Sequence, residues 1–505
     1  MMLRRLLCLG AVALATGGRA AAQEETCSAE WREVRAKMEA AELSEDFIQS
    51  FKHSYDAFVS GDSGTIPESA IDPVGDEFIP TLEAVRSAPG FEPDASLLDE
   101  LVILKLNGGL GTSMGLERAK SLLHVQGNTT FLDLIAQQVL ALRRLHQRQL
   151  RFTLMNSFST SADTKELLGR SYPSLASDAA IEVIQNKAPK IDRKTHGPAV
   201  WEPNAKLEWC PPGHGDLYAT LRGSGTLRQL VKDGYRYMFV SNSDNLGANL
   251  DLDILTHFGK SDMPFMMELC SRRENDKKGG HLARRKSDGQ LILREVAQCP
   301  EDDEDAFQDI SKHRFFNTNN LWLRLDKLLE AMDAAEGGAL PLPLIVAHKT
   351  VDPKDDTSTA VVHLETAMGA AIQFFDGAGG ILVDRDRFAP VKKTNDLFAL
   401  RSDAYRVSDA FTMVAATEGG VPPVIDLDKK HFKLVSQLEA SLTGDIPSLI
   451  RCKKLKVKGP VRFAPSRVRA HIAYAMPCLC SAHPPGFSVA AARRAEMRTR
   501  VLLSR

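Results

Sequence analysis

Residues 101–121 read LVILKLNGGLGTSMGLERAKS, and this stretch decides how the first half of the chain is expected to fold. The aliphatic run that opens it has the composition of a buried strand. Gly108, Gly109 and Gly111 follow, and glycine lets a backbone turn sharply and approach a ligand because it has no Cβ. Backbone N–H groups in such a loop make an anion site, and Lys120 supplies a counter-charge. The segment therefore predicts a site for nucleotide phosphates at the end of a strand.

Two common phosphate loops do not match this segment. A P-loop needs a lysine directly after a glycine, and no lysine holds that position here. The dinucleotide fingerprint G-x-G-x-x-G begins at Gly109 and Gly111, but Met114 stands at its third glycine. A tight surface turn is the alternative, and the apolar strand before the loop favours phosphate binding.

The composition is that of a soluble globular protein with room for two or three domains. The chain has 505 residues, of which 43% are hydrophobic and 25% charged. The formal net charge of −2 gives no basic field, so no nucleic-acid partner is expected. Outside the N-terminal leader no apolar run reaches the length of a membrane span, so no stable span is expected. The eight cysteines show no zinc-type pairing and fit a reducing, cytosol-like compartment.

The first 23 residues disagree with a cytosolic protein. Arg4 and Arg5 precede an apolar run at 6–15 and small residues at 20–22, which is the layout of a secretory signal peptide. This leader predicts a secretory or plastid route. A dispensable leader or a misassigned start is the alternative.

The rest of the chain divides into three parts. Residues 24–98 have helical periodicity, residues 99–440 alternate apolar strands with helical stretches, and residues 441–505 become irregular and then basic. The alternation predicts an α/β fold with a mixed, mostly parallel sheet flanked by helices. The expected strands cover residues 101–106, 152–156, 181–185, 236–241 and 264–270.

Polar side chains follow several of these strands, where ligands of open α/β sheets bind. Gln185 ends one strand and can read a base through its amide. His214 lies between two glycines after a proline pair, an arrangement that favours a ligand contact. Asn242, Ser243 and Asp244 follow another strand, and the Asp244 carboxylate suits Mg²⁺, which takes one or two carboxylates plus phosphate oxygens. A polar loop or an Asx turn is the alternative at each place.

A second acidic pair is the alternative to Asp244 as the metal site. Asp251 and Asp253 form a D-x-D pattern, but acids also suit the first turn of a helix, here expected at 251–258. The helix-start interpretation is preferred.

Two further segments offer groups for sugar hydroxyls and phosphate. They are NTNN at 317–320 and the lysines at 392–393.

Six motifs in this order resemble one known family. They are KLNGGLGTSMG with the following Lys120, WEPNAKLEWCPPGHGD, FVSNSDNLGA, FFNTNNLW, HLETAMGAAIQFF and FAPVKKTNDL. Together they resemble UTP–glucose-1-phosphate uridylyltransferases of the eukaryotic type over residues 95–463. The resemblance implies a Rossmann-like nucleotidyltransferase core, a helical N-terminal region and a C-terminal β-helix, which would be short and divergent here.

The resemblance also implies a role for each matching residue. Lys120 and Lys392 would be the catalytic cations, and Asp244 would bind Mg²⁺. The nucleotide site would comprise Leu106, Asn107, Gly108, Gly109, Lys120, Gln185, Gly213, Asp244 and Lys392. The sugar-phosphate site would comprise His214, Asn242, Ser243, Asn319 and Glu365.

The implied reaction is uridylyl transfer from UTP to glucose 1-phosphate, with release of pyrophosphate. A phosphate oxygen is already anionic, so catalysis needs charge neutralisation rather than a general base. The rivals are the same reaction on the 1-phosphate of N-acetylglucosamine or galactose, and a non-catalytic UDP-sugar-binding protein. The family's usual location is the cytoplasm, in conflict with the leader.

Two departures from the family pattern stand out. Residues 116–119 read LERA where many relatives carry CKGP, although the spacing to Lys120 is kept. After KKLKVKGPVRF at 453–463, the expected β-helix repeats are absent from the sequence. The family uses that domain in subunit contacts, so whether this chain forms a homo-oligomer is open.

Overall fold

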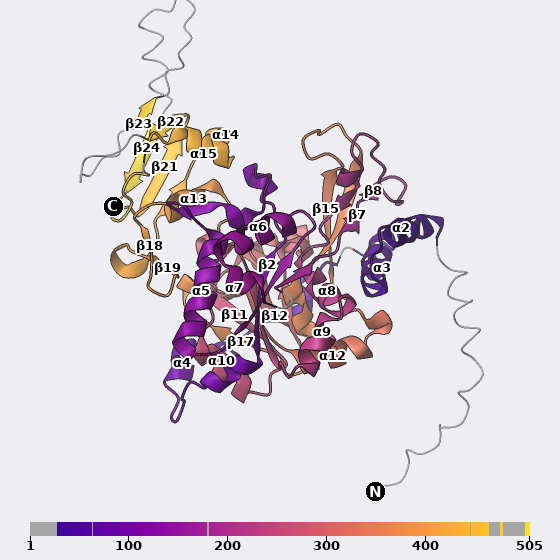
Figure 1. Ribbon diagram of the computed structural model, residues 1–505. Coiled ribbons are helices and arrows are strands. Elements are labelled where there is room, and N and C mark those ends of the chain that lie inside the picture. The colour runs from indigo at the N-terminus through magenta and orange to yellow at the C-terminus, as the bar shows by residue number, and fades with distance from the viewer. Residues whose placement is uncertain are drawn as a thin grey trace, which may run out of the picture.

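A ten-stranded mixed sheet forms the centre of the computed structural model (Figure 1). The structure describes residues 28–463, except 63, 179, 180 and 445, together with 475–477 and 500–504. The main path through the sheet is β1-β12-β14-β10-β2-β5-β6, and β11, β13 and β17 pair beside it. The strands are β1 (Ile71–Pro73), β2 (Leu101–Asn107), β5 (Arg151–Asn156), β6 (Glu182–Ile184), β10 (Tyr237–Asn242), β11 (Phe265–Ser271), β12 (His281–Arg285), β13 (Leu291–Arg294), β14 (Phe315–Arg324) and β17 (Gly379–Leu382).

The half of the sheet that carries the glycine loop is parallel. β10, β2, β5 and β6 pair in parallel, with Asn242 of β10 beside Leu106 of β2. The carboxyl ends of these strands therefore meet at one edge. All five strands expected from the sequence are present, as β2, β5, β6, β10 and β11.

The other half of the sheet is joined mainly by antiparallel pairings, although β11 and β17 pair in parallel. The long strand β14 runs antiparallel to both β10 and β11. β1 pairs with β12, so residues 71–73 of the segment expected to be helical belong to the central sheet. The prediction of a mixed α/β sheet is confirmed.

Helices cover both faces of the sheet because β2 is buried on both sides. Ile103 faces a hydrophobic cluster with one set of helices, and its neighbour Leu104 faces a second cluster on the opposite side. On the first face lie α4 (Leu82–Arg86), α5 (Phe131–His146), α6 (Ser161–Ser171), α7 (Pro173–Ala176), α10 (Leu252–Lys260) and α13 (Thr394–Leu400). On the second face lie α8 (Leu217–Gly223), α9 (Thr226–Lys232) and α12 (Leu325–Ala334).

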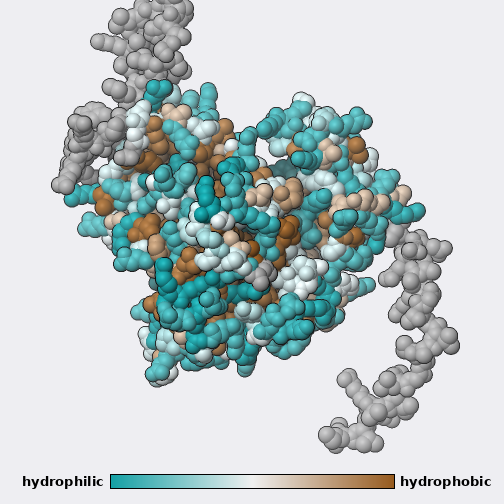
Figure 2. Space-filling model, viewed as in Figure 1, coloured by the Kyte–Doolittle hydropathy of each residue, from teal (hydrophilic) through white to brown (hydrophobic). Residues whose placement is uncertain are grey.

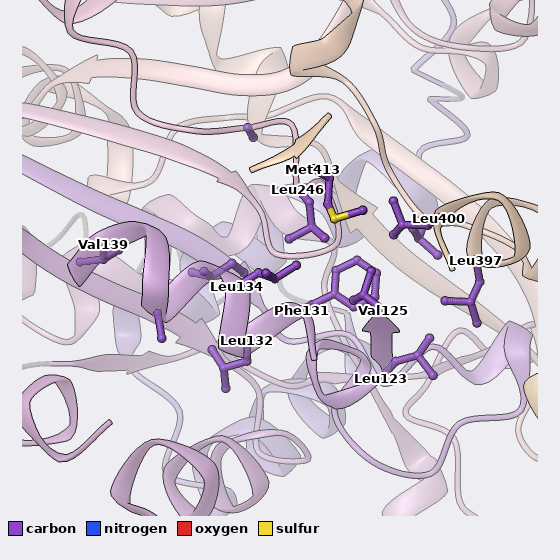
Figure 3. Close-up of a cluster of buried hydrophobic side chains, with 14 of the residues drawn as sticks. Leu123, Val125, Phe131, Leu132, Leu134, Val139, Leu246, Leu397, Leu400 and Met413 are labelled. Atoms are coloured by element: carbon purple, nitrogen blue, oxygen red, sulfur yellow. The ribbon is translucent and has the colours of Figure 1, made fainter. Parts of the chain in front are cut away.

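The start of α5 ties the first face together. Thr130 and Asp133 form a capping box there, which satisfies the first free N–H groups of the helix. Figure 3 shows Phe131 of α5 against Val125, with Leu397 and Leu400 of α13 on the same side. Val125 belongs to β3 (His124–Gln126), which pairs with β4 (Thr129–Thr130).

Two N-terminal helices pack on a separate small sheet. α2 (Ala29–Ala40) and α3 (Glu45–Val59) begin at the N-caps Ser28 and Ser44, and confirm helices in this part of the chain. Their apolar faces contact a smaller lobe, at the right of Figure 1. The strands of this lobe are β7 (Ala188–Pro189), β8 (Ile191–Asp192), β9 (Trp209–Cys210), β15 (Leu344–Thr350) and β16 (Ala360–Thr366).

The chain after α13 adds short strands at the edge of the core. β18 (Tyr405–Val407) pairs with β19 (Met413–Ala415), and β20 (Val424–Asp426) pairs in parallel with β21 (Lys454–Lys458). The remaining elements are α11 (Glu304–Gln308), α14 (Lys429–Phe432), α15 (Val435–Ser441), β22 (Val461–Phe463), β23 (Ala475–Pro477) and β24 (Arg500–Ser504).

Strands of a parallel β-helix pair in parallel, as β20 and β21 do, but β21 also pairs antiparallel with β24, and β22 pairs antiparallel with β23. The leader at 1–23 and most of the tail after 463 lie outside the described residues. Among the described helices none is long and apolar enough to cross a membrane. The face drawn in Figure 2 is mainly hydrophilic, with separate hydrophobic patches.

Candidate active site

The glycine loop after β2 bends back on itself to place Lys120. Gly111 has φ of +72°, a conformation that L side chains rarely adopt, and a Cβ there would lie 3.3 Å from Cγ of Lys120. The Lys120 backbone N–H donates to the carbonyl of Gly109 at 3.0 Å. The loop therefore brings a lysine to the carboxyl end of the strand.

Lys120 and Asp244 meet in an ion pair, although they lie on different segments. Lys120 Nζ is 2.6 Å from Asp244 Oδ2, and the two side chains are 15% and 22% exposed. The backbone N–H of Ser243 donates to the carbonyl of Leu106 at 3.1 Å, which holds the Asp244 turn against the glycine loop. The structure thus joins the predicted catalytic lysine and the predicted metal ligand.

Lys392 reaches the same place from a third segment. The backbone N–H of Val391 donates to the carbonyl of Asp244 at 3.1 Å. The side chain of Lys392 is exposed, and its charge acts on His214 and on Glu295. The segment that carries Lys392 therefore lies against the Lys120–Asp244 pair, where β2 and β10 end.

The side chain of Asn107 is not available to a ligand. It is 2% exposed, and its Nδ2 donates to Asn156 Oδ1 at 2.7 Å and to Thr164 Oγ1 at 3.0 Å. Its backbone opens the glycine loop, so only main-chain atoms of this residue can line a nucleotide site.

Gln185 closes one wall of the site together with two glycines. Its Nε2 donates to the carbonyl of Gly213 at 3.0 Å, and a Cβ on Gly108 would lie 2.4 Å from its Oε1. A Cβ on Gly213, which has φ of +81°, would lie 2.4 Å from the carbonyl oxygen of Thr366. Only glycine allows this approach, which brings Glu365 beside Gly213.

His214 is partly buried and is held in its neutral form. Burial lowers its pKa to about 4, with Glu365 raising the pKa and Lys392 lowering it. Its Nδ1 accepts the backbone N–H of Met368 at 3.0 Å. An accepting Nδ1 assigns the proton to Nε2, which can donate to a phosphate or hydroxyl.

Asn319 connects to the histidine through β14. It has φ of +60°, and its Oδ1 accepts from Nδ2 of Asn317 at 3.0 Å. A Cβ on Gly369 would lie 3.2 Å from the same Asn317 nitrogen, and Gly369 follows the Met368 that contacts His214. The NTNN segment therefore lies beside the histidine.

Sequence reasoning missed Glu295. Burial raises its pKa and Lys392 lowers it, and a Cβ on Gly280 would lie 2.6 Å from its Oε1. A single acid in the segment LREVAQ carries no motif signal, because only the packing of β13 and β12 places it near Lys392.

A buried ion pair, also missed, lies behind the site. Glu268 accepts from Arg387 Nε at 2.8 Å and from its Nη2 at 2.7 Å, and the carboxylate is 0% exposed. Asn320 Nδ2 and Trp322 Nε1 donate to the same carboxylate, each at 3.0 Å. Asn245 Nδ2 donates to the Arg387 carbonyl at 3.1 Å, which anchors the turn after Asp244.

The rival acidic pair has a structural role. Asp251 Oδ1 accepts from the backbone N–H groups of Asp253 and Ile254, as the N-cap of α10. Both acids also pair with Arg86. The helix-start interpretation of the D-x-D pattern is confirmed.

The residues present fit a Mg²⁺ ion shared with substrate. Asp244 offers one reachable carboxylate, and Mg²⁺ commonly takes one or two carboxylates with phosphate oxygens and waters. Within the described part of the chain no group of three or more His, Cys, Asp or Glu side chains could hold a metal alone. The donor set is therefore that of a metal carried partly by phosphates.

Comparisons with known proteins agree on one family. A family model described as UTP–glucose-1-phosphate uridylyltransferase matches residues 48–468. The chain is 37% identical over 438 residues to the UTP–glucose-1-phosphate uridylyltransferase of Hordeum vulgare, covering 86% of this chain and 89% of that protein. The Saccharomyces cerevisiae protein of the same name is 39% identical over 369 residues, covering 73% and 72%.

Solved structures give the same result. The UDP-glucose pyrophosphorylase of Leishmania major, known in open and closed structures, matches with a TM-score of 0.79 and 48% identity, over 85% of this chain and 91% of that one. A Trypanosoma brucei structure described as UDP-glucose phosphorylase matches with a TM-score of 0.79 and 46% identity, over 85% and 90%.

Proposed function

Because this chain belongs to the UTP–glucose-1-phosphate uridylyltransferase family, we propose that it transfers a uridylyl group from UTP to glucose 1-phosphate, giving UDP-glucose and pyrophosphate. The observation that supports this most is the ion pair of Lys120 and Asp244 at the ends of β2 and β10, with the segment of Lys392 bonded to the Asp244 backbone. Phosphoryl-type transfer needs charge stabilisation around a phosphate more than proton transfer, and these groups supply it.

The reaction is a displacement at the α-phosphorus of UTP. A phosphate oxygen of glucose 1-phosphate forms the new P–O bond, and the bond to the β-phosphate breaks with its electrons leaving on pyrophosphate. The attacking oxygen already carries negative charge, so no side chain has to remove a proton. The neutral His214 fits this scheme, because it can donate from Nε2 without acting as a base.

Lys120 is placed to change partners when substrate enters. Its ammonium is 2.6 Å from Asp244, and both groups remain partly exposed. A triphosphate carries more negative charge than one carboxylate, so Lys120 turns to the phosphates. Lys392 approaches from the opposite segment and neutralises charge at the reacting centre.

Asp244 is proposed to hold Mg²⁺ when Lys120 has turned away. The bound ion would neutralise phosphate charge there and orient the triphosphate. Within the chain, the backbone contacts of residues 243 and 244 to Leu106 and Val391 keep this carboxylate in place.

The remaining site residues are proposed to select the substrates. Gln185 would read uracil through its amide, with Gly213 and Gly108 allowing the close approach of the base. Leu106, Asn107 and Gly109 would line the nucleotide through the loop backbone. The sugar phosphate would contact His214, Asn242, Ser243, Asn319 and Glu365.

A pyrophosphate-release assay tests this function. The full chain is incubated with Mg²⁺, UTP and glucose 1-phosphate, and each substrate is omitted in turn. Release that depends on both substrates, with UDP-glucose formed, is the expected result. A panel with N-acetylglucosamine 1-phosphate and galactose 1-phosphate identifies the preferred sugar. Binding of UDP-glucose without release of pyrophosphate would instead indicate a non-catalytic UDP-sugar-binding protein.

We also propose that the protein acts in the cytoplasm. The described cysteines Cys210, Cys270, Cys299 and Cys452 are free thiols, which suits a reducing compartment. Mass spectrometry of the mature N-terminus and imaging of a tagged full chain test this. A mature chain that begins near Gln23 and resides in an organelle would replace the cytoplasmic location. Light scattering tests whether the chain forms a homo-oligomer.

A further inference from the structure

A cavity lies behind the candidate active site, on the face of the sheet covered by α5. Its volume is about 360 Å³, within the size range of small-molecule pockets. Its walls come from β2, β10 and α5, and include Ile103, Val139, Leu142 and Phe239. The walls are mainly apolar, which suits the body of a small apolar molecule.

One buried cation, Lys105, lines this apolar cavity. Lys105 is 3% exposed, and its Nζ donates to Ser241 Oγ at 2.8 Å and to the carbonyl of Ala248 at 2.6 Å. An ammonium group has three N–H bonds, so two protein acceptors leave one N–H for another partner.

Among the described residues, no carboxylate forms an ion pair with Lys105. Burial is the largest effect on its pKa and lowers it to about 7; Arg387 lowers the pKa further and Glu268 raises it. Glu268 itself is engaged by Arg387. Asp409 lines the cavity but is exposed to solvent, where its charge is screened. An anion inside the cavity would therefore stabilise the ammonium form.

A second polar group in the cavity wall also lacks a protein partner. Asn249 Oδ1 is buried, and no group in the described part of the chain forms a hydrogen bond with it. A flip of the Asn249 side-chain amide exchanges the positions of its oxygen and nitrogen, so Asn249 can present Nδ2 to an acceptor. Ala248, which accepts from Lys105, is its neighbour, so the two polar groups lie on the same part of the wall.

The loop 408–412 covers the cavity from the side opposite the sheet. Ala410 and Thr412 line it, and Phe411 between them has φ of +60°. Gln138 of α5 holds this loop by donating from Nε2 to the Phe411 carbonyl at 2.8 Å. The cavity is therefore bounded on the helix, sheet and loop sides by contacts that keep its shape.

We propose that this cavity binds a small carboxylate with an apolar body, such as a medium-chain fatty acid. The carboxylate accepts hydrogen bonds from Lys105 Nζ and from the Asn249 amide, and the hydrocarbon contacts the walls built from α5 and Phe239. The buried ammonium of Lys105 calls for a charged head, and the apolar walls call for an apolar body, so the ligand needs both. This site is separate from the nucleotide site and does not depend on the proposed reaction.

Titration calorimetry with octanoate on the full chain tests the site, with octan-1-ol as a ligand of similar length and no charge. Octanoate is expected to bind saturably and at least about tenfold more tightly than octan-1-ol, because the alcohol can accept a hydrogen bond from Lys105 but carries no negative charge to pair with the ammonium. Equal affinity for the two ligands, or no saturable binding of octanoate, would overturn the proposal.

Three variants separate the cavity from non-specific binding. Lys105→Met should weaken octanoate binding about tenfold to a hundredfold. Ala141→Trp fills the cavity from α5 without removing the charge, and should abolish binding even if Lys105→Met folds poorly. Arg144→Ala, an exposed change on the same helix and outside the cavity, should leave the affinity within about threefold, well below the loss of a charged hydrogen bond. Full-strength binding by a folded Ala141→Trp protein would contradict the site.

Discussion

Two ion pairs near the same turn differ in what surrounds them. Lys120 and Asp244 share one contact of 2.6 Å and keep 15% and 22% of their side-chain surface exposed. Arg387 and Glu268 share two hydrogen bonds, and Glu268 has no exposed surface. Both pairs hold the segment around Asp244, the first by its side chain and the second through Asn245.

The difference in burial and in the number of hydrogen bonds shows which of the two ion pairs can separate to bind another partner. Lys120 and Asp244 share a single contact and both keep some exposed surface, so water, phosphate or metal can take over each partner when they separate. Glu268 accepts hydrogen bonds from Arg387, Asn320 and Trp322. Removing either member of the Glu268–Arg387 ion pair leaves the other buried charge without compensation. The first pair suits binding and catalysis, and the second suits a fixed scaffold.

The largest expected effect is the loss of Asp244. Asp244→Ala should abolish Mg²⁺-dependent turnover while the thermal midpoint changes little, because the carboxylate stabilises the substrate complex and not the fold. Asp253→Ala is the matched control, since that acid lies at a helix start and pairs with Arg86. Steady-state assays over a range of Mg²⁺ concentrations measure the effect. Inactive Asp253→Ala with active Asp244→Ala would assign the metal to the other acidic pair.

A change in the buried Glu268–Arg387 pair should lower the stability of the fold. Glu268→Gln removes one charge and should reduce the free energy of unfolding by about 3–5 kcal/mol, because Arg387 keeps a buried charge without its partner. Denaturant unfolding followed by circular dichroism measures this. A loss below about 1 kcal/mol, the range of exposed pairs, would show that the two ion pairs do not differ as described.

Lys120 and Lys392 are both expected to contribute to turnover. Lys120→Ala or Lys392→Ala should lower kcat about 10²- to 10³-fold, the loss seen when one electrostatic stabiliser is removed. Lys327→Ala, a change to an exposed lysine on α12 that pairs with Glu330, is the control and should retain turnover. Pre-steady-state or steady-state kinetics measure kcat. Turnover within about threefold of the unmodified protein, well under the expected loss, would remove the assigned role.

Base selection should depend on Gln185. Gln185→Glu keeps the size of the side chain but removes the amide donor that now contacts Gly213. The ratio of kcat/KM for UTP over CTP should then fall about tenfold, the value of one or two hydrogen bonds. Unchanged selectivity with retained activity would show that Gln185 has only a structural role, through its contact with Gly213.

The smallest expected effect concerns pH. The folded pKa of His214 is about 4, below the ordinary value near 6.5, so the imidazole stays neutral from pH 8 down to pH 5.5. Protonation requires the pH to fall towards the folded pKa, so His214 should add no limb to the pH profile of kcat in this range. Comparison with His214→Gln checks this. A limb near pH 6.5 that disappears in the variant would contradict the neutral form.

Much of the fold followed from local sequence pattern. The aliphatic composition of the strands placed β2, β5, β6, β10 and β11, and acids at 251 and 253 placed the start of α10. Glycines and polar residues directly after strands indicated Lys120, Gln185, His214 and Asp244, and the structure brings these segments together. The other strands of the central sheet, β1, β12, β13, β14 and β17, were not predicted, and β1 has only three residues, which carry too little periodicity.

The sequence by itself determined the type of sheet, the glycine loop and the chemical groups available for binding phosphate. The tertiary structure decided which groups meet. Lys120 and Asp244 are 124 positions apart and come together because β2 and β10 pair in parallel, with their carboxyl ends at the same edge. Burial likewise set the neutral state of His214, the place of Glu295 beside Lys392 and the scaffold pair Glu268–Arg387. Desolvation and long-range contacts depend on packing, and no local pattern encodes them.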